Sequence, residues 1–66
     1  MIDIWKFEGE KNVRLTSTYG KIVEGKVIDV IDAEDKEDET EDSICIENKN
    51  GIFEFPQSEV KDIQIM

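Results

Sequence analysis

The chain has 66 residues, a net charge of −9, no histidine and a single cysteine. A chain of this length forms one small domain. It cannot form an internal disulfide or a thiolate metal cluster, and it cannot form a zinc site or a general base that needs histidine. No apolar run approaches the roughly 20 residues of a membrane span, and the first eleven residues do not read as a signal peptide, so we expect a cytoplasmic protein.

The first ten residues are ambiguous because large apolar side chains occupy both alternating faces. In an alternating pattern Ile2 and Ile4 face one side, and Trp5 and Phe7 face the other. The pattern fits a short edge strand, and it also fits a turn of helix that closes one end of a barrel. In both interpretations Ile4, Trp5 and Phe7 cover the core.

Residues 12–18, NVRLTST, alternate between apolar and polar side chains, which predicts a half-buried strand. Val13 and Leu15 face the core in this interpretation. Tyr19 and Gly20 then form a turn, where Gly20 tolerates the positive φ of a tight hairpin.

The stretch GKIVEGKVIDVID, residues 20–32, predicts one long strand that bends near Gly25. A helix is the competing interpretation, because Val27, Val30 and Ile31 have helical spacing. The abundance of valine and isoleucine, the internal glycine and the lack of an N-cap favour the strand. The paired apolar residues beyond Gly25 indicate a second half that is buried on both faces or bulges.

Residues 32–42, DAEDKEDETED, form an acidic segment with eight acids and one lysine, a charge of −7, and the rest of the chain carries only −2. Like charges at this density cannot bury themselves, so we predict a mobile loop. An acidic field also repels phosphate groups, which disfavours non-specific binding to nucleic acids and anionic membranes.

The remaining residues predict three more strands. Residues 43–48 alternate, residues 49–51 form an Asn-Gly hairpin turn, and residues 52–55 follow as the partner strand. Pro56 stops this ladder, residues 56–59 fit a helical turn, and residues 60–66 make the last strand. Five strands in one domain of residues 1–66 predict an all-β, strongly bent SH3-like barrel, because closure removes exposed edges.

The spacing of Gly20, Gly25 and Asp32 resembles the first motif of the Sm-like (LSm) family, whose fold is a five-stranded, strongly bent SH3-like barrel. Residues 52–65 resemble the second motif, which is an apolar strand, a short turn and a second apolar strand. The resemblance implies that the chain assembles into rings, because the family often pairs the last two strands of neighbouring subunits in six- or seven-membered rings.

Two positions depart from the RNA-binding members of that family. Those members typically carry an asparagine three residues beyond the aspartate, and an Arg-Gly pair after the strand of the second motif. Here Asp35 stands at the first position and Pro56-Gln57 at the second. The resemblance therefore implies the architecture without the residues of the RNA pocket.

The acidic segment does not fit a specific cation site. In a calcium loop that starts at Asp32, Lys36 takes a ligand position and no glycine follows, and a loop that starts at Asp35 has no glycine either. Carboxylates on a mobile loop also lack the rigid placement that catalysis needs. We therefore expect no metal ion, no cofactor and no enzymatic activity, and we expect Cys45 to be a buried or half-buried small side chain.

Tyr19 is the aromatic residue most expected to be exposed. The candidate partner-binding residues are Arg14, Tyr19, Lys21, Asp32 and Asp35, and Gly20 and Gly25 are structural. We predict a non-enzymatic module that binds protein or associates with itself. The alternatives are an atypical Sm-like RNA-binding ring that uses Arg14, Lys21 or Lys26, and an acidic decoy that mimics nucleic-acid charge.

Overall fold

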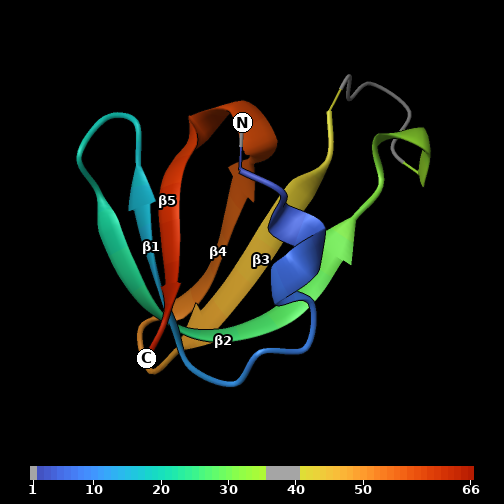
Figure 1. Cartoon of the computed structure of the whole chain (residues 1–66). Coiled ribbons are helices and arrows are strands. Elements are labelled where there is room, and N and C mark those ends of the chain that lie inside the picture. Colours follow the sequence, from blue (N-terminus) through green and yellow to red (C-terminus); the bar gives the residue numbers. More distant parts are fainter. Residues whose placement is uncertain (1, 36–40) are drawn as a thin grey trace.

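The computed structural model describes residues 2–35 and 41–66, which form strands and short 3-10 helices (Figure 1). The predicted all-β class is confirmed, with five antiparallel strands in one sheet. The elements in chain order are η1 (Ile4–Phe7), β1 (Val13–Ser17), β2 (Ile22–Ile31), η2 (Ala33–Asp35), β3 (Ser43–Asn48), β4 (Gly51–Pro56), η3 (Gln57–Glu59) and β5 (Val60–Ile65).

The sheet is strongly bent but open, so the prediction of a closed barrel needs correction. The strand order is β4-β3-β2-β1-β5, and every neighbouring pair is antiparallel. The long strand β2 pairs with β1 along its first half and with β3 along its second half, as Figure 1 shows. Strand β5 follows β4 through η3 but pairs with β1, which leaves both β4 and β5 as edges of the sheet.

The bend of β2 lies at Gly25, as predicted. Gly25 pairs with Val13 of β1, and the next residue, Lys26, pairs with Glu47 of β3. A Cβ atom on Gly25 would overlap the backbone carbonyl oxygen of Glu47. Glycine therefore permits the close approach at which β2 exchanges one partner strand for the other.

Beyond the bend, β2 contains the irregularity that its paired apolar residues indicated. The register with β3 shifts between Val27 and Asp29, which leaves Ile28 without a partner in the ladder. The Ile28 side chain is 40% exposed, whereas Val27 and Val30 are buried. The second half of β2 is thus a bulged strand and not a strand buried on both faces.

The core lies between the two halves of the bent sheet and draws on every strand. The aromatic residues contribute unequally: Phe55 is buried, Phe7 and Phe53 pack partly against the core, and Trp5 is 38% exposed. Cys45 is buried, as predicted. The apolar cluster consists of Ile4, Val13, Leu15, Val23, Val27, Val30, Ile44, Ile46, Phe55, Val60 and Ile63.

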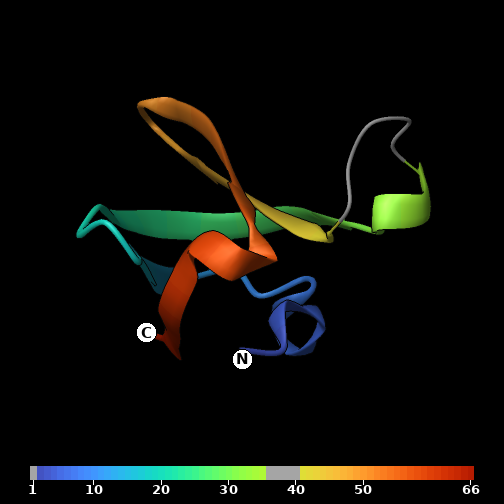
Figure 2. The same cartoon turned by 90° about the horizontal axis from the view of Figure 1, so that it is seen from above.

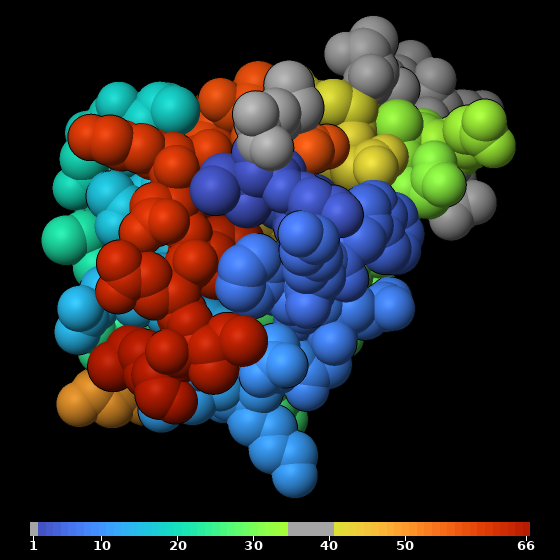
Figure 3. All heavy atoms as spheres, viewed as in Figure 1, coloured from blue at the N-terminus to red at the C-terminus, as the bar shows by residue number. Residues whose placement is uncertain are grey.

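The N-terminal residues adopt the helical alternative. The side chain of Asp3 accepts a hydrogen bond from the Trp5 N–H at the start of η1, and Ile4 is fully buried. The amide of Gln57 donates to the Ile2 carbonyl, which ties this segment to η3. Figure 3 shows the N-terminal segment on the surface beside β5.

The described parts of the acidic segment have defined local structure. Ala33–Asp35 form η2, and at the other end the Glu41 carboxylate accepts hydrogen bonds from the backbone N–H and the hydroxyl of Ser58. Residues 36–40 lie outside the described residues, so the mobility expected for the whole segment stays a prediction.

Replacing Gly25 with valine should destabilise the protein by about 3 kcal/mol, the upper end of the cost of overpacking, because the clashing atom belongs to the backbone. Urea unfolding measures the change. Lys26→Val is the matched control, since Lys26 is an exposed neighbour in the same strand and should change stability by less than about 0.5 kcal/mol. Equal midpoints for the two variants would contradict the close approach.

Candidate interaction groove

A groove opens where the β3–β4 hairpin leaves β2. Strand β3 pairs with β2 only from Lys26 onward, so the hairpin tip stands away from the first half of β2 (Figure 2). The space has a volume of about 660 Å³. It is lined by Lys21, Ile22, Val23, Glu24, Asn48, Lys49, Asn50 and Phe53, and we refer to it as the groove.

Backbone groups of β2 face the groove. The Ser17 N–H donates to the Lys21 carbonyl at 2.8 Å, so the backbone groups of Lys21 point toward β1. In an antiparallel pair this direction alternates, so the N–H and C=O groups of Ile22 and Glu24 point away from β1. In the described part of the chain, no strand pairs with Ile22 on that side.

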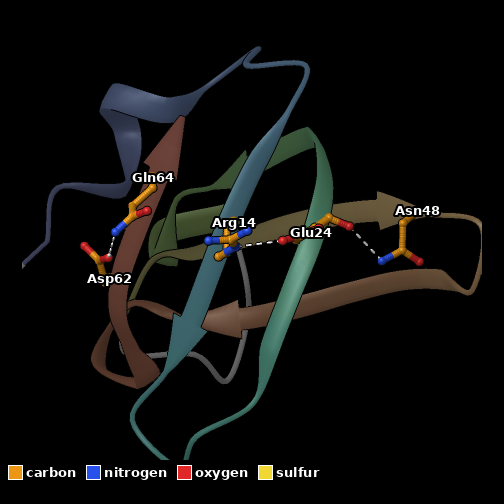
Figure 4. Close-up of polar contacts among 5 residues, drawn as sticks. All are labelled: Arg14, Glu24, Asn48, Asp62 and Gln64. Carbon is orange, nitrogen blue, oxygen red and sulfur yellow. Dashed lines mark hydrogen bonds and ion pairs between the residues drawn. The ribbon is translucent and has the colours of Figure 1, made fainter. Parts of the chain in front are cut away.

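Asn48 occupies part of this free backbone. Its side-chain Nδ2 donates to the carbonyl of Glu24 at 2.9 Å, as Figure 4 shows. Its Oδ1 accepts from the Asn50 N–H at 2.8 Å, which holds the hairpin turn. Asn48 therefore holds the hairpin beside β2 with one side-chain hydrogen bond. If the ladder between β2 and β3 continued to this point, a backbone N–H of β3 would donate to the Glu24 carbonyl instead.

Lys21, which immediately precedes β2, reaches across the groove to β4. Its Nζ atom lies 4.7 Å from the centroid of the Phe53 ring, within the range of a cation–π interaction. Phe53 is half-buried, and its ring packs against the core. The ammonium group is therefore held over an aromatic floor and remains exposed to solvent.

The groove is locally cationic in an acidic chain. Among the described residues that line it, Glu24 is the one carboxylate, and it accepts a hydrogen bond from Arg14 Nε at 2.7 Å across the outer face of β1 and β2 (Figure 4). Such an exposed pair contributes at most about 1 kcal/mol to stability, but it balances the charge of Glu24. Lys21 and Lys49 then set the sign of the groove.

The structure brings together only part of the predicted partner-binding set. Lys21 lines the groove, and Arg14 borders it through its ion pair with Glu24. Tyr19 is 62% exposed in the turn that leads into β2, as predicted. Gly20 in the same turn has a φ of 89°, the left-handed conformation that the sequence indicated.

The two predicted aspartates do not join this site. Asp32 follows the far end of β2, where its side chain accepts a hydrogen bond from the Glu34 N–H at 2.9 Å. Asp35 ends η2, and its side chain lies outside what the structure describes. Sequence reasoning missed the groove contributions of Asn48 and Lys49, whose only signal was the hairpin turn itself.

Asp42 is a second residue that the sequence did not single out. Its carboxylate accepts from Trp5 Nε1 at 2.7 Å and from the Ala33 N–H at 2.9 Å, and its carbonyl accepts from the Gln57 N–H. It thus connects η1, η2 and η3. The hydrogen bond from the Trp5 side chain, and then that from the Ala33 backbone, lower the pKa of Asp42.

Over residues 2–35 and 41–66, no three histidine, cysteine, aspartate or glutamate side chains are arranged to hold a metal ion. No helix in the same ranges is long and apolar enough to cross a membrane. No family model, curated protein or solved structure matches the chain. The resemblance to the Sm-like family therefore stays a prediction.

The stability contributed by Asp42 should disappear in acid. A carboxyl group whose pKa is lowered by folding stabilises the protein above its unfolded-state pKa of about 3.9, and this contribution is lost as the pH falls through the lower native value. The stability difference between the wild type and Asp42→Asn should therefore shrink from pH 6 to pH 2.

Unfolding followed by fluorescence of Trp5, the chain's one tryptophan, measures this difference. Asp29→Asn removes the same charge from an exposed position in β2 and controls for the general relief of acidic repulsion. A difference between the wild type and Asp42→Asn that stays constant over this pH range would rule out the charged hydrogen bonds as its cause.

Proposed function

We propose that the protein is a non-enzymatic interaction module that associates with copies of itself through the two edges of its open sheet. The observation that supports this is the position of β4 and β5 at opposite ends of the strand order, each paired on one side only within the described chain. Free strand edges are templates for pairing with another chain.

Each of the two edges carries exposed apolar side chains. Ile52 on β4 and Ile65 on β5 are each 61% exposed, and Met66 beside the second is 53% exposed. The features that oppose pairing at these edges are Pro56, which has no N–H to donate at the end of β4, and the charged residues Glu54 on β4 and Lys61 and Asp62 on β5. Pairing β4 of one copy with β5 of the next would cover both isoleucines.

A contact between two different edges is heterologous, so it generates a ring if the rotation between copies closes. The resemblance of Gly20, Gly25 and Asp32 to the Sm-like motif supports a ring, because that family often assembles through the same pair of strands. The open sheet supports the same arrangement, since the strand that would complete each edge comes from a neighbour.

The solution mass tests this proposal. Sedimentation should give a multiple of the monomer mass for the wild type, and Ile65→Lys and Ile52→Lys should each shift it toward the monomer, because a charge on an edge opposes pairing. Ile22→Lys is the matched control, since Ile22 is 60% exposed but lies on β2. A monomeric wild type at high concentration would contradict self-association.

RNA binding ranks behind this proposal because the cations expected to serve it are few and dispersed. Arg14 is paired with Glu24, and Lys21 lies over Phe53. Affinity for RNA depends on lysine and arginine that neutralise phosphates. A titration with short uridine- or adenine-rich RNA near physiological salt should show binding weaker than about 1 μM. Tighter binding that weakens with salt would put the RNA-binding alternative first.

A further inference from the structure

We propose that the groove binds an extended peptide segment of another protein, one that alternates apolar and acidic side chains, as an added strand beside the first half of β2. This proposal rests on the proposed role as an interaction module. It concerns a different surface from the edges of β4 and β5, and it names the chemistry of the partner.

The backbone supplies the first part of the argument. The N–H and C=O of Ile22 and the N–H of Glu24 point into the groove, where no strand of the described chain pairs with them. An extended peptide can satisfy these groups by strand addition, which makes main-chain hydrogen bonds independent of the partner's sequence. The Glu24 carbonyl is already bonded to Asn48, so the added pairing is short.

The apolar lining supplies the second part. Phe53 is half-buried and Val23 is buried on the core side of β2, whereas the side chain of Ile22, 60% exposed, lies on the opposite face of the strand. In a strand, alternate side chains point to the same side. A peptide with apolar residues at every second position would place them against Phe53 and Val23 and remove apolar surface from water.

The lysines supply the third part, because they select the sign of the partner's charge. Lys21 is held over the Phe53 ring before any ligand binds, and Lys49 is exposed at the hairpin tip on the other wall. Among the described residues that line the groove, the one carboxylate, Glu24, is balanced by Arg14, so the carboxylates of a bound peptide meet a net positive charge there. The groove thus favours acidic peptides over basic ones.

The size and charge of the groove argue against other occupants. A volume of about 660 Å³ lies within the roughly 300–1,000 Å³ of sites that hold a small ligand or a short segment. In the part of the chain that the structure describes, a nucleic acid would meet two lysines there, on a chain of net charge −9. The peptide is the occupant that uses the backbone, apolar and charged groups together.

The test is a titration of ¹⁵N-labelled protein with a capped peptide of about six residues, the usual strand length, that alternates valine and glutamate. The largest amide shifts should occur at Ile22, Glu24 and Asn50, and the amides of Phe55 on β4 and Ile63 on β5 should not shift. A valine–lysine peptide should bind at least about tenfold more weakly, and N-methylation of alternate peptide amides should abolish binding.

Charge reversal in the protein provides the complementary measurement. Lys21→Glu combined with Lys49→Glu should weaken binding of the valine–glutamate peptide by about tenfold or more and favour the valine–lysine peptide. Lys11→Glu makes the matched control, because Lys11 is exposed before β1 and outside the groove. The amide spectrum of each variant shows that it is folded.

Three results would overturn the proposal: no shift of the groove amides at millimolar peptide, equal affinity for the two peptides, or shifts confined to the edges of β4 and β5. Shifts of the groove amides with oligoadenylate in place of the peptide would assign the groove to nucleic acid. A monomeric wild type that binds the valine–glutamate peptide in the groove would remove self-association and leave this proposal standing.

Discussion

The close approach of backbones at Gly25 is the constraint on which the rest of the structure depends. At this residue β2 leaves β1 and takes β3 as its partner, with the Glu47 carbonyl where a side chain would otherwise lie. One strand therefore belongs to both halves of the sheet, which lets a short chain enclose a core. A Cβ atom here would push the two halves apart and expose the buried residues between them.

The same constraint leaves backbone groups unpaired. A strand that turns sharply away from one neighbour cannot keep the other neighbour along its whole length, so the hairpin of β3 and β4 diverges from the part of β2 that precedes Lys26. The groove is the direct consequence of this divergence. Asn48 satisfies one of the groups with its side chain, and the groups of Ile22 remain directed at the groove.

The sequence predicted the parts of the fold that local patterns determine. The alternation of Val13 and Leu15, the glycine in β2 and the hairpin at residues 49–51 placed each strand within a few residues. Whether the sheet closes depends on the relative orientation of its two edge strands, β4 and β5. A local sequence pattern does not specify that orientation. The links made by Asp42 were hidden for a similar reason, because its partner Trp5 lies 37 residues away.

The long strand also separates opposite charges, which lets a cationic groove exist on an acidic chain. Lys21 precedes β2 and Asp32, the first residue of the acidic segment, follows it. Eleven residues at about 3.3 Å each give a path of roughly 36 Å along the bent strand, in a molecule whose longest extent is 31 Å. Even with the bend, this separation exceeds the screening length of about 8 Å at physiological salt. Asp32 therefore does not neutralise Lys21, and the charge that a partner meets at the groove is set locally by Lys21, Lys49 and the balanced pair of Arg14 and Glu24.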